Sequence, residues 1–170
     1  MLYFAIAFIL FAAGADQLTK LLVFGHDCAV IPGIVKFASV ENHGMVWGIA
    51  NGVNGLMTAV SFITAAVIVI MTVILIKYRK KMGWPILLSL AAVIGGAIGN
   101  LIDRIALGFV RDFICTEFID FPVFNVADIF VTLGAIGLGI LIIFTKRGHE
   151  FMAALFPEEK SKQAPPAEEK

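Results

Sequence analysis

A small set of charged and amide side chains is spaced so that its members share helix faces. Asp16 and Lys20 are four positions apart, and Asn125 and Asp128 are three apart, which places each pair on one side of a helix. Two carboxylates that face each other share one proton, because like charges about 3 Å apart cannot both ionise. The set consists of Asp16, Lys20, Asn100, Asp103, Arg104, Asp112, Asn125 and Asp128.

Two kinds of chemistry suit such carboxylates. In a hydrolase, the charged member of a pair takes a proton from water, and the protonated member polarises the carbonyl that is cleaved. In an ion-coupled transporter or channel, the carboxylates bind ions or protons instead. The spacing of Asp103, Asp112 and Asp128 alone does not choose between these two functions.

The other side chains that could support catalysis are scattered along the chain. His26, His43 and His149 form no metal-binding pattern with the two cysteines. A Ser-His-Asp triad could only use Ser39 with His26 or His43, and no nucleophile elbow surrounds Ser39. A pairing of Ser39 with a lysine has no support from the spacing either. We therefore expect neither a metal nor another cofactor.

The composition indicates a membrane protein. Of the 170 residues, 59% are hydrophobic and only 15% are charged, against about 45–50% and about 25% in soluble proteins. The mean hydropathy is +0.93. Thirteen basic residues balance thirteen acidic ones, so no net charge attracts a polyanion. These values exclude a disordered chain and a nucleic-acid-binding protein.

Four segments are long and apolar enough to cross a bilayer, which needs about 20 residues in a helix. They lie within a single integral-membrane domain at residues 1–156, and a disordered cytoplasmic tail is expected at 157–170, which is rich in proline and charge. The predicted spans are approximately 2–24, 53–76, 83–105 and 122–145.

The cations predict the orientation of these spans, because short cytoplasmic loops collect Lys and Arg. Both termini should therefore be cytoplasmic, and the carboxylates of Asp16, Asp103, Asp112 and Asp128 should lie toward the outer face. An Asp is costly at membrane depth unless it is paired, so a cluster of them favours a functional site. The cations that follow the second and fourth spans are Lys77, Arg79, Lys80, Lys81, Lys146, Arg147, Lys160 and Lys162.

The N-terminal segment has one feature of a cleaved signal peptide. Ala13-Gly14-Ala15 resembles a secretory cleavage site after an apolar stretch. However, no Lys or Arg precedes this stretch, and its loss would leave three spans and disturb the distribution of cations. We therefore expect the segment to be retained as the first span.

The segment between the first two spans is too polar to cross the membrane. Pro32-Gly33 is a turn signal, and residues 34–40 alternate in polarity and include β-branched side chains. A small extracytoplasmic β-structure is expected within residues 26–52, and a short outer loop or helix within 107–123. The expected fold class is thus a membrane all-α protein of four helices with a β-cradle. Cys28 and Cys115, both outside, could pair or stay free.

Five motifs in order resemble the bacterial lipoprotein signal peptidases, the type II signal peptidases. Any one of them is weak evidence, but the five at these separations are specific. They are Asp16-Gln17-Leu18-Thr19-Lys20, Asn42-His43-Gly44, Gly99-Asn100-Leu101-Ile102-Asp103-Arg104, Val110-Arg111-Asp112-Phe113 and Phe124-Asn125-Val126-Ala127-Asp128.

The resemblance implies an intramembrane aspartic endopeptidase of the bacterial inner membrane, with its site at the outer leaflet. Its catalytic pair would be Asp112 and Asp128. Its substrates would be prolipoproteins, cleaved on the N-terminal side of a cysteine that carries diacylglycerol. The resemblance further implies contact with membrane lipids and inhibition by cyclic peptides of the globomycin type. A monomer is compatible with a substrate helix that enters from the lipid.

Supporting roles follow from side-chain chemistry. The amides of Asn42, Asn100 and Asn125 can donate to a developing oxyanion or hold the substrate backbone. A network of Asp103 with Arg104 is expected to brace the site, since a guanidinium fits a carboxylate. Asp16 and Lys20 are expected to orient the first span or to meet the substrate, although a lysine at a helix end can also reach the interface. Gly44 and Ala127 complete the proposed site.

Two places depart from the family pattern. Around Asn42 the family usually has small residues and a Phe, whereas this chain has His43, Met45, Val46 and Trp47. Arg111 stands before Asp112, where an apolar residue is expected; in an extended segment it would point away from the pair and act as a modulator at most. Beside the peptidase, two interpretations remain open: a small transporter or channel, and a non-catalytic assembly protein of the envelope.

Overall fold

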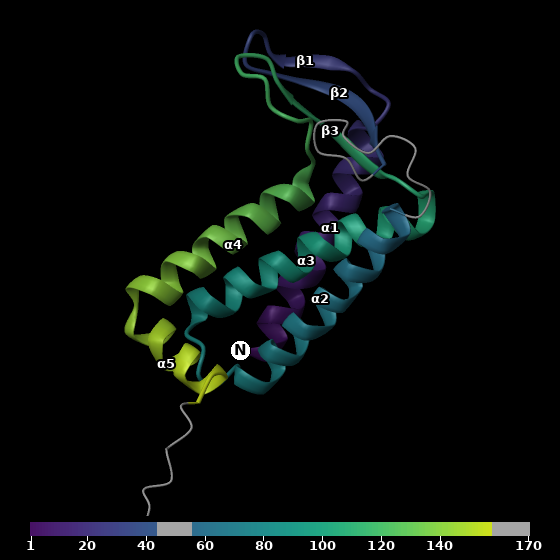
Figure 1. The fold of residues 1–170 in the computed structure, drawn as a ribbon. Helices are drawn as coiled ribbons and strands as arrows, with labels where there is room; N and C mark the ends of the chain where they lie inside the picture. Colours follow the sequence, from purple (N-terminus) through teal and green to yellow (C-terminus); the bar gives the residue numbers. More distant parts are fainter. Residues whose placement is uncertain (44–55, 158–170) are drawn as a thin grey trace, which may run out of the picture.

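Four long helices form the body of the protein. The computed structural model describes residues 1–43 and 56–157. Within these ranges, four helices are long and apolar enough to cross a membrane, as the sequence predicted, and they lie side by side in a bundle (Figure 1). They are α1 (Leu2–Val23), α2 (Leu56–Tyr78), α3 (Trp84–Leu107) and α4 (Val126–Phe144).

Helix α3 is the centre of the bundle. It packs against α1, α2 and α4, and it holds most of the buried helical residues. Glycines permit this close approach. A Cβ atom at Gly99 would lie 2.5 Å from Oδ2 of Asp16, so a larger residue there would displace α1 or the carboxylate. The helix ends at Gly108, whose φ of 81° is left-handed and suits glycine.

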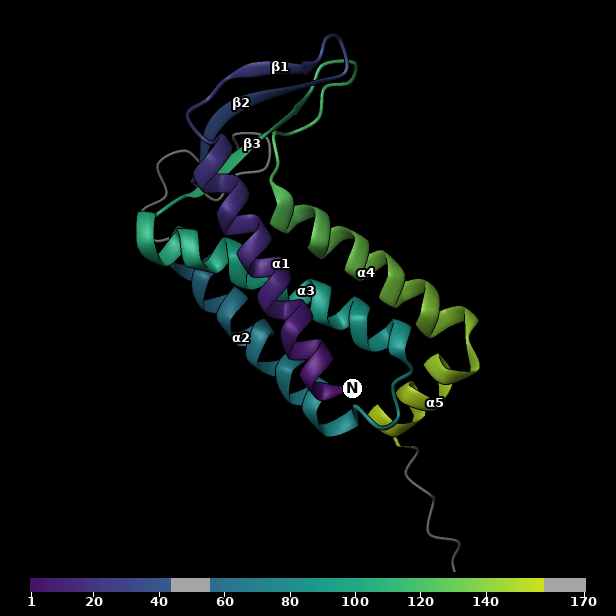
Figure 2. The same cartoon turned by 180° about the vertical axis from the view of Figure 1, so that it is seen from behind.

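A three-stranded antiparallel sheet covers one end of the bundle. Its strands are β1 (Cys28–Ile31), β2 (Val35–Asn42) and β3 (Val110–Thr116), in the order β1-β2-β3. Figures 1 and 2 show the sheet at the end of the bundle opposite the N-terminus and α5 (Lys146–Leu155). The β-structure was predicted from residues 26–52, but its third strand was not.

Strand β3 corrects the prediction of an outer loop or helix at 107–123. Its residues Val-Arg-Asp-Phe-Ile-Cys-Thr contain β-branched and aromatic side chains that suit a strand. Val110 pairs with Asn42 and Thr116 with Val35, about 70 to 80 positions away in the chain. This long-range pairing provides the backbone hydrogen bonds that decide the conformation.

The start of α4 and the helix α5 also differ from the prediction. The fourth span was expected from residue 122, but α4 begins at Val126, because Asn125 and Asp128 form a capping box there. After α4, Thr145 caps α5 by accepting a hydrogen bond from the Gly148 amide. Helix α5 is too polar to cross a membrane and was not predicted.

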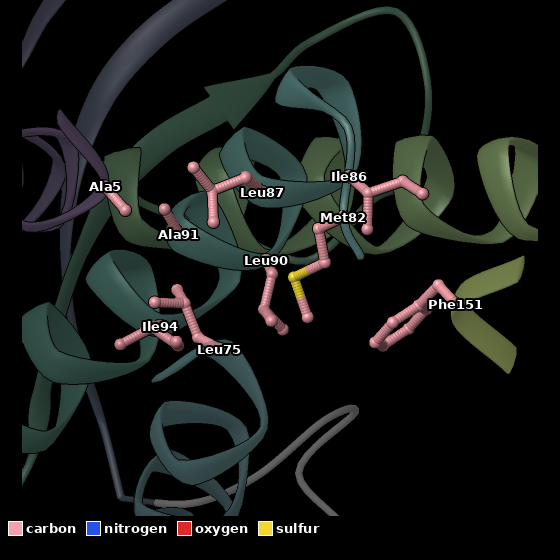
Figure 3. Packing of buried hydrophobic residues seen from close by; sticks show 9 residues of the cluster. All are labelled: Ala5, Leu75, Met82, Ile86, Leu87, Leu90, Ala91, Ile94 and Phe151. Atoms are coloured by element: carbon pink, nitrogen blue, oxygen red, sulfur yellow. The ribbon is translucent and has the colours of Figure 1, made fainter. Parts of the chain in front are cut away.

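The hydrophobic core lies at the end of the bundle far from the sheet. Figure 3 shows one cluster formed by Leu75 of α2, Met82 of the α2–α3 connection, Leu87 and Leu90 of α3, and Phe151 of α5, each at most 4% exposed. This packing of α5 against α2 and α3 explains why the short helix forms. The cluster thus fixes the helix ends far from the sheet, while polar contacts fix the ends near the sheet.

The two cysteines, both in the described part of the chain, are free thiols. Cys28 pairs with Phe37 of β2, and Cys115 pairs with Lys36 of the same strand. The cysteines therefore lie on strands two places apart, which is about 9 to 10 Å. A disulfide requires Cα atoms within about 7 Å, so the sheet excludes the pairing.

Candidate active site

Two carboxylates meet where the sheet joins the helices. Asp112 lies on β3 and Asp128 on the first turn of α4. Both line a cavity of about 600 Å³. Most of the remaining lining is apolar: Phe121, Pro122, Val123, Phe124, Ile129 and Leu133, together with Asn42 and Thr132. The cavity is therefore suited to a largely hydrophobic ligand, and it presents two acids to that ligand.

Two asparagine amides hold the Asp112 carboxylate. Asn42 Nδ2 donates to Oδ2 at 2.8 Å, and Asn125 Nδ2 donates to Oδ1 at 2.6 Å. Asn42 reaches Asp112 because Val40, two residues earlier on β2, is the residue that pairs with Asp112. Burial, together with the charge of Asp128, raises the pKa of Asp112 to about 6 against the lowering effect of the two amides.

The capping box of α4 fixes Asp128. Its Oδ2 accepts from the Asn125 backbone N–H at 3.1 Å, and its own backbone N–H donates to Asn125 Oδ1 at 3.0 Å. Asn100 of α3 donates to the other carboxylate oxygen at 2.8 Å. Asn125 thus contacts both acids, since its side-chain amide reaches Asp112 and its backbone reaches Asp128.

A buried ion pair ties α1 to the site. Lys20 Nζ lies 2.7 Å from Asp16 and 3.3 Å from Asp103, and all three side chains are fully buried. Lys20 also donates to Asn100 Oδ1 at 2.9 Å. The interfacial location considered for Lys20 is therefore wrong. Asp16 accepts from the Ala127 backbone N–H at 2.9 Å, which holds the start of α4 against α1.

Asp103 does not form its close ion pair with Arg104, the neighbour expected to hold it. In the described residues, Asp103 instead pairs with Arg111, whose guanidinium lies 2.8 Å away, and with Gln17, whose amide donates at 3.0 Å. Arg111 points away from Asp112, as the alternation of a strand predicted, but it reaches α3 and α1. Sequence reasoning missed Gln17, although its i,i+3 spacing to Lys20 was a signal.

Arg104 lies half-buried beside the carboxylates. Its charge interacts favourably with Asp128, Asp112 and Asp103. Among the residues that the structure describes, Arg104 Nε has no hydrogen-bond partner although it is buried. A buried guanidinium N–H without an acceptor is costly, so this group is suited to a ligand that supplies one.

The structure therefore gathers nearly all of the residues singled out in the sequence. A continuous set of hydrogen bonds and ion pairs includes ten side chains or backbone groups. Gly44, also proposed from the sequence, lies outside the described residues. No group of three or more His, Cys, Asp or Glu in the ranges 1–43 and 56–157 is placed to hold a metal ion. The ten are Asp16, Lys20, Asn42, Asn100, Asp103, Arg111, Asp112, Asn125, Ala127 and Asp128.

Comparison with known proteins shows the family. Residues 6–144 match the family model described as signal peptidase (SPase) II. The chain is 36% identical over 152 residues to the lipoprotein signal peptidase of Enterococcus faecalis, covering 86% of this chain and 91% of that protein. It is 38% identical over 146 residues to the lipoprotein signal peptidase of Caldanaerobacter subterraneus, covering 82% and 96%.

The fold agrees with this result. A solved structure described as a bacterial membrane enzyme matches with a TM-score of 0.72 and 29% identity, and the match covers 96% of each chain. A second one matches with a TM-score of 0.72 and 31% identity, covering 86% of this chain. These matches favour a multi-pass membrane peptidase of aspartic type over a transporter or an assembly protein. The chain belongs to the signal peptidase II family.

Proposed function

We propose that the protein removes signal peptides from prolipoproteins and cleaves on the N-terminal side of the diacylglyceryl-modified cysteine. The observation that carries this proposal is the pair of carboxylates, Asp112 and Asp128, which faces an apolar cavity of about 600 Å³. A cavity of this kind accepts an apolar signal peptide and a lipid-bearing residue. The names of the similar proteins from Enterococcus faecalis and Caldanaerobacter subterraneus support the choice of substrate.

In the proposed mechanism the two acids share one proton. We propose that Asp112 carries this proton at the start of the cycle, which its raised pKa favours, and that Asp128 acts as the base. Asp128 takes a proton from water, and the water oxygen attacks the scissile carbonyl while Asp112 donates its proton to the carbonyl oxygen. The tetrahedral intermediate collapses as the C–N bond breaks: the amine leaves with the proton held by Asp128, and Asp112 takes a hydroxyl proton of the intermediate, which restores the starting state of the pair.

The asparagines position the acids in this mechanism. Each of Asn42, Asn100 and Asn125 donates from its side-chain amide to a carboxylate oxygen, so a primary role in binding the oxyanion is not needed. They are neutral and leave the charge of the pair unchanged. Arg104 is the proposed partner of a substrate carbonyl, because its charge lies close enough to interact with both carboxylates and its buried Nε has an N–H to donate.

The proposed location is the bacterial inner membrane, with the termini in the cytoplasm and the acids at the outer leaflet. Lys77 lies in the last turn of α2, Lys81 follows in the connection to α3, and Lys146 begins α5, so these cations lie at the end of the bundle opposite the sheet. The cavity is lined by Ile129 and Leu133 on α4, which suits a substrate that enters sideways from the lipid. Lipid contact, globomycin-type inhibition and a monomeric state remain parts of this proposal.

The function is tested with purified protein in detergent and a diacylglyceryl-modified prolipoprotein. We expect release of the signal peptide from the modified precursor. The unmodified precursor should be cleaved at least about tenfold more slowly, because it lacks the acyl chains that would contribute binding energy in the apolar cavity. Gel electrophoresis follows both substrates in parallel. Equal rates on the two precursors would contradict the lipid dependence, and no cleavage of either would refute the function.

The pH dependence follows from Asp112. Its pKa is raised to about 6, so the carboxyl holds a proton below that pH and loses it above. Because the mechanism starts from protonated Asp112, kcat/KM should be highest near or below pH 6 and fall about tenfold per unit well above it. Rates measured on the modified precursor between about pH 5 and 8 test this. A kcat/KM that rises across this range would contradict the assignment of the proton.

A further inference from the structure

Arg111 makes an unusually complete set of contacts with one buried acid. Its terminal nitrogen lies 2.8 Å from Asp103 Oδ1, its Nε lies 3.2 Å from Oδ2, and its backbone N–H donates to Oδ2 at 2.9 Å. The Asp103 side chain is fully buried and that of Arg111 is 14% exposed. A bidentate contact of this kind is strong and directional. Arg111 also donates to Gln17 Oε1 at 3.0 Å.

The direct ion pairs around Asp103 balance in charge only when Arg111 is counted. Asp16 and Asp103 supply two negative charges, and Lys20 and Arg111 supply two positive ones. Without Arg111, the single ammonium of Lys20 would face two fully buried carboxylates. An uncompensated buried charge is strongly unfavourable, and its field extends far in an apolar surrounding.

Two routes connect this charge balance to the proposed catalytic pair. Along β3, Arg111 immediately precedes Asp112, and Asn125 Nδ2 contacts both the Arg111 carbonyl oxygen, at 3.4 Å, and Asp112. Through the helices, Lys20 lies against Asp103 and donates to Asn100, which in turn donates to Asp128. A shift of Arg111 would therefore move both acids.

We propose that Arg111 is a positioning residue of this peptidase: by neutralising buried Asp103 it fixes β3 against α3 and α1 and sets the charge that surrounds Asp112 and Asp128. This inference rests on the proposed function. The charged groups that face the pair or Arg111 come from every neighbouring element and are Asp16 and Lys20 of α1, Glu41 of β2, Asp103 and Arg104 of α3, Asp112 of β3 and Asp128 of α4.

The first test is Arg111→Gln, assayed for cleavage of the modified precursor. We expect kcat to fall about 10- to 100-fold with KM changed less than about twofold, because the residue touches the acids' supports and not the cavity. The negative charge of Asp103, no longer balanced, should also shift the pH above which kcat/KM falls, its pH limb, upward by about half a unit or more. Lys36→Gln is the matched control, since Lys36 forms an exposed ion pair with Glu117 on the same sheet. It should leave all three values unchanged.

Restoring the charge balance gives the decisive comparison. In the double variant Arg111→Gln/Asp103→Asn, Lys20 again faces one carboxylate, so we expect kcat about tenfold above that of Arg111→Gln and a pH limb near that of the wild type. Arg111→Lys keeps the charge but loses the fork, so its pH limb should stay in place while kcat falls less than about tenfold.

Three results would overturn the inference. They are wild-type kcat and pH profile in Arg111→Gln, a double variant no more active than Arg111→Gln, or a pH limb that moves in Arg111→Lys. If Arg111→Gln does not fold, a pH limb that moves in Arg111→Lys, or a double variant that also fails to fold, overturns the inference. Wild-type protein runs beside every variant, and its failure to cleave would refute the proposed function. In that case, thermal unfolding of wild type, Arg111→Gln, Asp103→Asn and the double variant still tests the coupling of Arg111 with Asp103.

Discussion

Asp112→Asn and Asp128→Asn should each lower kcat on a diacylglyceryl-modified prolipoprotein by at least about 1,000-fold. Either change removes one member of the pair that must hold one proton and one negative charge. An asparagine in either place can neither take the proton of the attacking water nor deliver one to the carbonyl oxygen. Losses of this size are typical when a group that acts directly in bond cleavage is removed.

Both variants should remain folded, which separates catalysis from stability. Asparagine keeps an oxygen that can accept from Asn42 in place of Asp112, or from the Asn125 backbone N–H in place of Asp128. Thermal unfolding measured in the same detergent checks this. Asp120→Asn is the matched control, because Asp120 is an exposed acid of the β3–α4 connection, and it should keep full activity. Full activity in Asp112→Asn would contradict the assignment of the pair.

Asn125→Ser should have the second largest effect, a fall in kcat of about 100-fold or more. Asn125 contacts both acids: its amide donates to Asp112 at 2.6 Å and its backbone N–H donates to Asp128 at 3.1 Å. Serine is a good N-cap, so helix α4 should still begin at Val126. It lacks the amide, however, and Asp112 would lose the donor that fixes its orientation toward Asp128.

Comparison with Asn125→Ala separates the cap from the amide. Alanine loses both functions, so this variant should be less stable than Asn125→Ser by about 1 kcal/mol while both are inactive. Thermal unfolding and the cleavage assay are measured on the same samples. Wild-type kcat in Asn125→Ser would show that the amide of Asn125 is dispensable for placing Asp112.

The spans could be predicted from the sequence because the bilayer sets the length of an apolar helix. The i,i+4 spacing of Asp16 and Lys20 predicted that these two residues lie together, and the order of the spans predicted that the acids lie near the same end of the bundle. The structure joins these residues by contacts. The family was predicted correctly from the five motifs. In each of these cases the signal is local, or it depends on the order of short motifs along the chain.

Contacts between distant segments could not be predicted in the same way. Strand β3 forms because Val110 and Thr116 pair with β2, and no pattern within residues 107–123 specifies that partner. The pairing of Asp103 with Arg111 depends on the same register, since it turns Arg111 toward α3 while Asp112 turns toward the cavity. Arg104, adjacent to Asp103 in sequence, was therefore the wrong choice.

The central claim is that Asp112 and Asp128 together hydrolyse one bond, the bond before the lipid-bearing cysteine. Mass spectrometry of the products from wild-type protein and from Asp112→Asn tests it most directly. We expect the wild type to yield a product that begins with the diacylglyceryl cysteine, and we expect Asp112→Asn, folded by its unfolding curve, to yield none. The same product from folded Asp112→Asn at the wild-type rate, or a wild-type product that begins at another residue, would contradict the claim.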